Sequence, residues 1–263
     1  MPRARLVREL SAAEGTKLAL VSAPAGSGKT TVLAEWHEAP QEPRPFGWLS
    51  LDSSDNDTVR FVDGAISALR TVAPGVGEEA LSALTGPAGL MDVVLPSLIN
   101  DVSALGEPVV VVLDDYHLIR NERVHGFVDA LVEHLPQTLQ LAIATRSQPP
   151  LALDRLRARR QLIEVGVDDL RFTDAEATSF LNGLLRLDLG QDDIAQLQAR
   201  TEGWAAGLQL AACRSRAKTT PGRSSPRSRA MTGRSSTTSD SRCSTASRPR
   251  CVTSSFAARS WTA

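Results

Sequence analysis

The sequence predicts an α/β protein in which a parallel β-sheet is flanked by helices. Short apolar runs alternate with longer segments of helical periodicity through the first 213 residues. Such alternation is typical of parallel strands joined by crossover helices. Residues 109–113 are five consecutive apolar residues, the pattern of a strand buried on both faces. These two observations define the fold class, and the individual elements follow from the same periodicities.

Five strands are predicted, with helices in the segments between them. We expect strands at 17–22, 45–51, 108–113, 139–145 and 161–165. We expect helices between and beside them at 30–38, 58–72, 90–105 and 121–135. These elements would make up a first domain over residues 1–170.

The pattern changes beyond Thr173, where no further strand is expected. Residues 173–176, Thr-Asp-Ala-Glu, have the form of a helix capping box with Thr173 as the N-cap. Further helices are expected at 174–186, 191–200 and 203–212. They would form a partial helical subdomain over residues 171–213, whose expected place is as a lid over a bound ligand.

The loop after the first expected strand carries the strongest chemical signal. Residues 23–30 read Ala-Pro-Ala-Gly-Ser-Gly-Lys-Thr and precede a helical pattern. This matches the phosphate-binding pattern G-x-x-x-x-G-K-[ST] except that Ala23 replaces the first glycine. In such loops, backbone N–H groups surround phosphate oxygens at the start of the next helix. The alternative, an ordinary glycine-rich turn, is disfavoured because the flanking strand and helix are both present.

The side chains of this loop have distinct expected roles. Gly26 and Gly28 can adopt backbone angles closed to other residues, which lets a phosphate approach closely. Lys29 is expected to reach the β- and γ-phosphates, and the Thr30 hydroxyl is expected to bind Mg²⁺. The expected nucleotide-binding residues are Pro24, Ala25, Gly26, Ser27, Gly28, Lys29, Thr30 and Thr31.

Two carboxylates follow the buried strand at 108–113. Ligands of open α/β sheets bind at the carboxyl ends of the strands, where Asp114 and Asp115 are expected to lie. Asp114 would hold Mg²⁺, directly or through water, and Asp115 would act as a general base toward the attacking water. Taken alone, Asp-Asp at a strand end is equally consistent with a simple turn.

A third polar residue follows the strand expected at 139–145. Arg146 ends this apolar run, and we expect the strand to lie between the two motif strands. Arg146 would then meet the γ-phosphate or the charge that develops on it. A solvated arginine at a strand end is the alternative interpretation.

Other classes of site have little support in the sequence. Cys213, Cys243 and Cys251 show neither metal-ligand spacing nor a disulfide framework. The four histidines are scattered, and only His117 lies beside the paired carboxylates. No apolar stretch is long enough to span a membrane and no signal-peptide pattern opens the chain. We therefore expect a cytoplasmic protein without a membrane partner.

Residues 214–263 differ sharply in composition from the rest. They contain eleven basic residues, one acid, 21 Ser or Thr, and no leucine. Such a segment buries too little apolar surface to order itself, so we expect a disordered tail. Its charge could attract DNA non-specifically, but we expect no sequence-specific DNA binding. The abrupt change suggests that these residues arise from a shifted reading frame and that the chain is truncated after about residue 213.

The motifs together resemble the nucleotide-binding domain of MalT-type regulators, which are large LuxR-family transcription factors of the STAND class of signal-transduction NTPases. The matching segments are residues 3–7, 21–36, 47–52, 113–119, 144–165, 168–182 and 201–212. The resemblance implies that ATP is bound with Mg²⁺ and hydrolysed slowly as a switch, with self-association through the domain. In related proteins a proline contacts adenine where this chain has Gln209. A stand-alone P-loop ATPase or a small-molecule kinase is the alternative.

Overall fold

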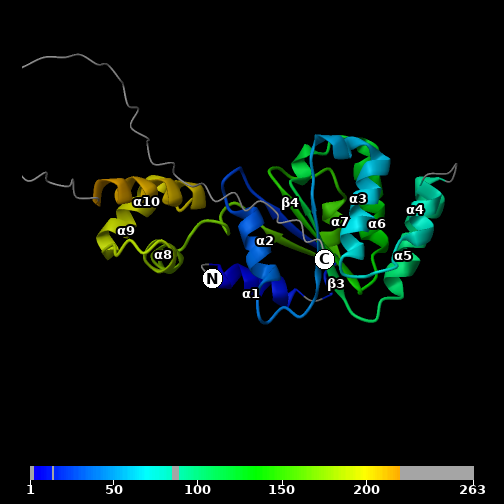
Figure 1. Cartoon of the computed structure of the whole chain (residues 1–263), viewed down its shortest axis with the longest axis horizontal. Coiled ribbons are helices and arrows are strands. Elements are labelled where there is room, and N and C mark those ends of the chain that lie inside the picture. The colour runs from blue at the N-terminus through cyan, green and yellow to red at the C-terminus, as the bar shows by residue number, and fades with distance from the viewer. Residues whose placement is uncertain (1–2, 14, 85–88, 220–263) are drawn as a thin grey trace, which may run out of the picture.

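A five-stranded parallel sheet forms the centre of the molecule, as the sequence predicts (Figure 1). The computed structural model describes residues 3–13, 15–84 and 89–219. The strand order is β2-β3-β4-β1-β5, and every pair is parallel. The strands are β1 (Leu18–Ser22), β2 (Phe46–Ser50), β3 (Val109–Asp114), β4 (Leu139–Thr145) and β5 (Leu162–Val165). β4 therefore lies between β1 and β3, the two strands that lead into the motifs.

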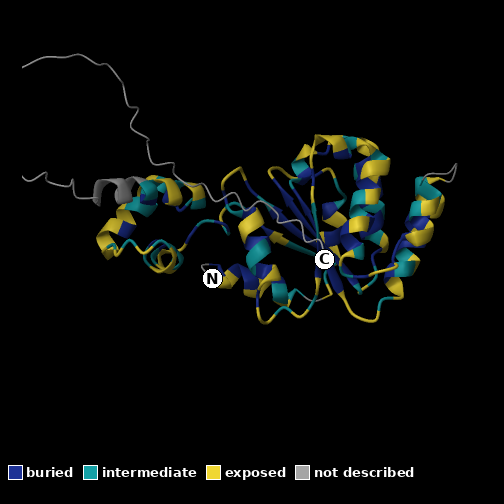
Figure 2. Ribbon diagram, viewed as in Figure 1, coloured by how far each residue is buried: buried dark blue, intermediate teal, exposed yellow. Residues whose placement is uncertain are grey.

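Helices cover both faces of the sheet, and alternate strand residues point to the two sides. On one face, Val110 and Val112 join a core with α1 (Ala4–Ala12) and α2 (Lys29–His37). On the other face, Val111 and Leu113 join a larger core. The helices that contribute to it include α3 (Thr58–Arg70), α5 (Leu95–Ser103), α6 (Glu122–His134) and α7 (Leu153–Ala158). Figure 2 shows the buried strands between helices whose outer surfaces are exposed, so the molecule has three layers here.

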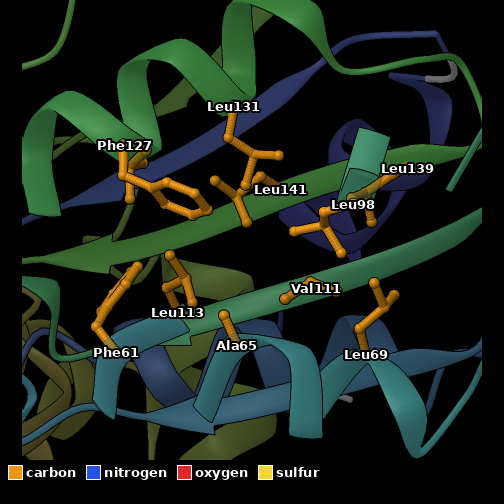
Figure 3. Close-up of a pocket in the computed structure, with 11 residues that line it drawn as sticks. Phe61, Ala65, Leu69, Leu98, Val111, Leu113, Phe127, Leu131, Leu139 and Leu141 are labelled. Carbon is orange, nitrogen blue, oxygen red and sulfur yellow. The ribbon is translucent and has the colours of Figure 1, made fainter. Parts of the chain in front are cut away.

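A small void lies within the larger core. A cavity of about 30 Å³ lies between β3, β4 and the helices packed on them (Figure 3). Its lining is entirely apolar and includes Val111, Leu141, Phe61 and Phe127. It is close to the size of one water molecule and has no polar partner for one, so we assign it to imperfect packing.

Two expected helices differ from the structure, and other observed helices were not expected. The single helix expected at 90–105 is a π-helical turn, Leu90–Val94, followed by α5. The reason is Pro96 at the start of α5, which cannot donate the backbone bond that a continuous α-helix needs. Likewise, the helix expected at 174–186 is α8 (Asp174–Thr178) followed by a π-helical turn, Ser179–Leu184. Helices α1 and α4 (Glu78–Leu84) were not expected at all.

The helical part of the chain lies beside the sheet, near α1 and α2 (Figure 1). Helices α8, α9 (Gln191–Thr201) and α10 (Ala205–Thr219) enclose a small core of their own around Leu181, Ile194 and Leu208. The capping box at Thr173 is present, with bonds between Thr173 and Glu176 in both directions.

Helix α10 continues beyond the expected end at 212. It runs to Thr219, so the first six residues of the segment expected to be disordered are helical. Alanine, arginine and lysine are strong helix formers, which explains the continuation. The remainder of the expected disordered tail, residues 220–263, lies outside the described residues. Within the described part, no helix combines the length and apolarity needed to cross a membrane.

A buried arginine joins the helical part to the sheet. The Arg3 guanidinium donates to the backbone carbonyls of Leu170 and Arg171 at 2.5 and 3.2 Å. It also lies 3.7 Å above the Phe172 ring centre and 3.7 Å from a Glu176 carboxylate oxygen. Arg3 is only 2% exposed. The connection between the two parts is therefore fastened by a residue from the opposite end of the described chain.

Candidate nucleotide site

The loop from β1 to α2 has the backbone shape that its glycines predict. Gly26 and Gly28 have φ values of 78° and 89°, in the left-handed region that other residues avoid. Gly28 is the N-cap of α2, so the helix starts at Lys29, one residue before the expected start at Thr30. The helix N-terminus and the loop N–H groups thus lie at the same end of the sheet, which favours a bound anion.

The Lys29 amine is held inside the loop. Its Nζ donates to the carbonyl oxygens of Ala23 at 2.8 Å and Pro24 at 3.0 Å. The side chain is largely buried. Burial lowers the pKa of Lys29, and the nearby positive charge of Arg146 lowers it further. A positive group that lies within the loop and has little water around it is well placed to bind a phosphate.

The two sequence motifs meet through Thr30 and Asp114. Thr30 Oγ1 donates a hydrogen bond to Asp114 Oδ2 at 2.9 Å, although the residues are 84 positions apart. Asp114 is 4% exposed, and burial raises the pKa of its carboxyl group. The backbone N–H of Asp115 donates to Asp114 Oδ1 at 2.9 Å. A hydroxyl and a carboxylate oxygen therefore lie side by side beneath the loop.

Asp115, His117 and Arg146 surround this pair. Asp115 has a left-handed backbone, with φ of 58°, and its side chain is 48% exposed. The His117 Nδ1 atom lies 3.7 Å from Asp115 Oδ1. Arg146 follows β4 and is exposed. Its positive charge nevertheless contributes to lowering the pKa of both Lys29 and His117. The structure thus brings together the residues that the sequence predicted for the reaction.

The first turn of α10 contacts the phosphate loop, which the sequence did not indicate in detail. The backbone N–H of Ala206 donates to the Gly26 carbonyl oxygen at 3.2 Å. A Cβ atom on Gly26 would lie only 2.9 Å from the Ala206 Cβ, and one on Gly28 would lie 3.6 Å from the Ala205 Cβ. The run of small residues at 205–207 is the signal for this close approach. Gln209, further along α10, is exposed.

The site suits a phosphate group with a magnesium ion. Ser27 Oγ is fully buried and has no hydrogen-bond partner among the described residues, and a phosphate oxygen would supply an acceptor. No cluster of three or more His, Cys, Asp or Glu occurs in the described part of the chain. The Thr30 hydroxyl and the Asp114 carboxylate supply the one or two oxygen ligands that Mg²⁺ commonly takes from a protein, with phosphate and water completing its shell.

The fold and this site define a P-loop NTPase domain. No family model matches the chain. It is 38% identical over 216 residues to the HTH-type transcriptional regulator MalT of Serratia proteamaculans and 37% identical to MalT of Yersinia enterocolitica. Each match covers 81% of this chain and 24% of the relative, so the chain spans about a quarter of their length. We therefore assign it as carrying a MalT-type nucleotide-binding domain.

A solved structure supports the same fold. The STAND protein PH0952 of Pyrococcus horikoshii, a signal-transduction ATPase with a tetratricopeptide-repeat sensor, matches with a TM-score of 0.57 at 18% identity. The match covers 77% of this chain and 28% of that protein. At this identity the likeness concerns the fold alone, and it agrees with a P-loop NTPase sheet.

Proposed function

We propose that this chain binds ATP with Mg²⁺ and hydrolyses it slowly, as the switch domain of a MalT-like regulator. The observation that carries the proposal is the bond between Thr30 and Asp114 beneath a loop with two left-handed glycines. A hydroxyl and a carboxylate suited to a metal ion thus lie next to a loop backbone suited to phosphate, which supports the proposal. The similarity to the transcriptional regulator MalT supports a regulatory role for nucleotide binding at this site.

Each expected site residue keeps its role in the proposal. The loop residues 24–31 surround the phosphates, and Lys29 leaves its two carbonyl partners to contact the β- and γ-phosphates. Thr30 and Asp114 hold the magnesium ion, which neutralises phosphate charge when bound. Asp115 accepts a proton from the attacking water, and Arg146 stabilises the charge on the γ-phosphate.

The wider organisation is also part of the proposal. Residues 1–170 act as the nucleotide-binding domain and residues 171–213 as a partial lid that contacts the loop through Ala206. We propose a cytoplasmic protein that self-associates through the NTPase domain. Binding of DNA to one specific sequence is not proposed for this chain, and tail residues 220–263 would contribute only salt-sensitive attraction.

Calorimetry with ATP and Mg²⁺ tests the proposed function. The Lys29→Ala variant is expected to lose most of its affinity, because it removes the positive charge closest to the phosphates. Lys17→Ala is a matched control, since Lys17 precedes β1 at the opposite end of the strand and donates to the Glu133 carbonyl. The control should bind like the unmodified protein. Equal ATP affinity in all three proteins would remove the basis for the proposal.

A further inference from the structure

Tyr116 and His125 form a hydrogen-bonded pair within the larger core. Tyr116 begins a short 3-10 turn, Tyr116–Leu118, that follows β3. It is only 1% exposed. Its hydroxyl oxygen lies 2.9 Å from Nδ1 of His125 on α6, and the two ring centres are 5.5 Å apart. A hydroxyl buried among apolar side chains is costly without a partner, so this bond is what allows Tyr116 to be buried.

The surroundings of the pair determine which residue holds a proton. Burial raises the pKa of Tyr116 well above its ordinary value, and the negative charge of Asp129 raises it further, so the phenol keeps its proton. Burial lowers the pKa of His125, against the opposing effects of Glu122 and of a backbone hydrogen bond with Ile119. His125 is therefore neutral near neutral pH and gains its proton only in acid.

A single arrangement of protons satisfies the pair while His125 is neutral. A neutral imidazole has one N–H donor and one acceptor nitrogen. The backbone bond with Ile119 favours a proton on the ring, so that bond uses the N–H. Nδ1 is then the acceptor, and the Tyr116 hydroxyl donates to it.

Protonation of His125 disrupts this arrangement. Both nitrogens of an imidazolium ring are donors, so Nδ1–H and the Tyr116 O–H would face each other at 2.9 Å. The phenol oxygen can accept from Nδ1–H only if its own proton turns away. Within the described part of the chain the Tyr116 hydroxyl has no second hydrogen-bond partner. That proton would therefore be buried without an acceptor, which destabilises the pair.

The neighbouring elements offer no replacement charge for the pair. Glu122 and Asp129, which act on the histidine and the tyrosine, both lie on α6 itself. The Asp129 carboxylate already accepts the backbone N–H of Ala152, just ahead of α7, at 2.7 Å. Helices α3 and α5 present apolar side chains to α6, among them Phe61 and Leu98. In the part of the chain that the structure describes, the histidine is thus the group whose titration decides whether the pair stays bonded.

The turn that this pair holds is part of the candidate site. Asp115, directly before Tyr116, has a left-handed backbone with φ of 58°, which is costly for a residue other than glycine. The turn is closed by two backbone bonds of 3.0 Å, from the Leu118 N–H to the Asp115 carbonyl and from the Ile119 N–H to the Tyr116 carbonyl. Without the bond to its tyrosine side chain, the turn loses an anchor that opposes this backbone cost.

We propose that Tyr116 and His125 form a pH-sensitive switch, which keeps the turn after β3 closed while His125 is neutral and lets it open when His125 is protonated. The opening itself does not depend on nucleotide. Its effect on hydrolysis rests on the proposed function, because that effect passes through Asp115. The folded chain favours the neutral ring, so this stabilisation is complete above pH 6.5, the ordinary pKa of histidine, and is lost as the pH falls below it.

Amide hydrogen exchange on the full chain tests the switch. At a pH of about 5.5, the Leu118 and Ile119 amides should exchange roughly tenfold faster in the unmodified protein than in His125→Asn, the effect of one buried group that loses its partner. The asparagine keeps an acceptor oxygen near the place of Nδ1 but cannot gain a proton. At a pH of about 8, where histidine is neutral, the two proteins should agree. Comparison at equal pH removes the intrinsic pH dependence of exchange.

Two further variants serve as controls. His134→Asn changes an exposed histidine on the same helix, bonded to the Ala130 carbonyl, and should keep the full acid response. Tyr116→Phe removes the hydroxyl, so the two turn amides should exchange fast at both pH values. The Val112 amide, within β3, should show no difference between the proteins. A response of equal size at Val112 would indicate global unfolding and overturn the switch, as would equal exchange of the turn amides in His125→Asn and the unmodified protein in acid.

Two more measurements separate this inference from the proposed function. In Tyr116→Phe the neutral ring loses its donor, so the pKa of His125, followed by NMR, should rise above that in the unmodified protein. An unchanged pKa would overturn the switch even where ATP is hydrolysed. Single-turnover hydrolysis should fall more steeply in acid in the unmodified protein than in His125→Asn, and identical profiles would overturn the link to Asp115. If the exchange results hold while no ATP is hydrolysed, the switch stands and the proposed function fails.

Discussion

The backbone N–H of Ala206 donates to the Gly26 carbonyl, so the first turn of α10 lies directly on the phosphate loop. The two residues are 180 positions apart. Any change in loop shape that moves the Gly26 carbonyl must therefore move, or break away from, the start of a 15-residue helix. Through this contact, the conformation of the phosphate loop can affect the position of the helical part.

Gly26→Ala should disturb this contact. The new Cβ would lie 2.9 Å from the Ala206 Cβ, and φ of 78° disfavours any side chain by about 1–2 kcal/mol. Gly15→Ala is the control, because Gly15 has φ of 80° but no heavy atom within 4 Å of the new Cβ. Both variants should unfold at lower temperature, but only Gly26→Ala should also lose ATP affinity. Similar affinity losses in both would show that the contact is irrelevant.

Thr30→Val should make the affinity for ATP insensitive to magnesium. The substitution keeps the side-chain shape but removes the hydroxyl that bonds Asp114. We expect ATP affinity in Thr30→Val to become nearly independent of Mg²⁺, whereas Thr30→Ser should retain the dependence. Titrations with ATP, with and without Mg²⁺, give the comparison. A full magnesium effect in Thr30→Val would exclude Thr30 as a ligand.

Asp115→Asn should separate binding from hydrolysis. The amide cannot accept a proton, so the rate should fall on the order of 10²–10⁴-fold while ATP affinity stays close to normal. Single-turnover measurements suit a slow enzyme. Hydrolysis at the original rate would dismiss Asp115 as the base.

Val111→Ile should stabilise the protein by filling the cavity. The added methylene would enter the void of about 30 Å³ and gain up to about 0.8 kcal/mol. Val110→Ile makes the same change on the other face of the strand, where Val110 is fully buried and does not line this cavity. That variant should lose roughly 1–3 kcal/mol through overpacking. Chemical denaturation would compare the two, and equal effects would contradict the packing argument.

Arg3→Met should loosen the helical part. The change removes the donors to the 170 and 171 carbonyls and leaves Glu176 without its buried partner, at a cost of about 3 kcal/mol. Arg8→Met is the control, because Arg8 is exposed and its side chain bonds to the Ala4 carbonyl of its own helix. Limited proteolysis should cleave Arg3→Met first within 171–213. Cleavage that matches the control would argue against the fastening role.

The sequence predicts the sheet and the central site well because both depend on local patterns. The apolar runs locate all five strands to within a residue or two, and parallel strands bring motifs such as Thr30 and Asp114 to the same edge. The features that the sequence did not predict depend on contacts between residues far apart in the chain. The small residues at 205–207 permit a close approach, but nothing local identifies Gly26 as their partner. Helix α1 was not predicted, and the role of Arg3 depends on carbonyl groups that lie about 167 residues further along the chain.

The buried Arg3 also constrains the order in which the chain can fold. During synthesis the first helix emerges early, but the carbonyls that bind Arg3 are made about 167 residues later. Until then a charged group destined for the interior stays in water, and α1 lacks one of its anchors. Because contacts between distant residues form late, closure of the N-terminal segment should be among the last events of folding. A fusion partner attached directly ahead of Arg3 would interfere at that step, so a flexible spacer is the better choice for expressing this protein.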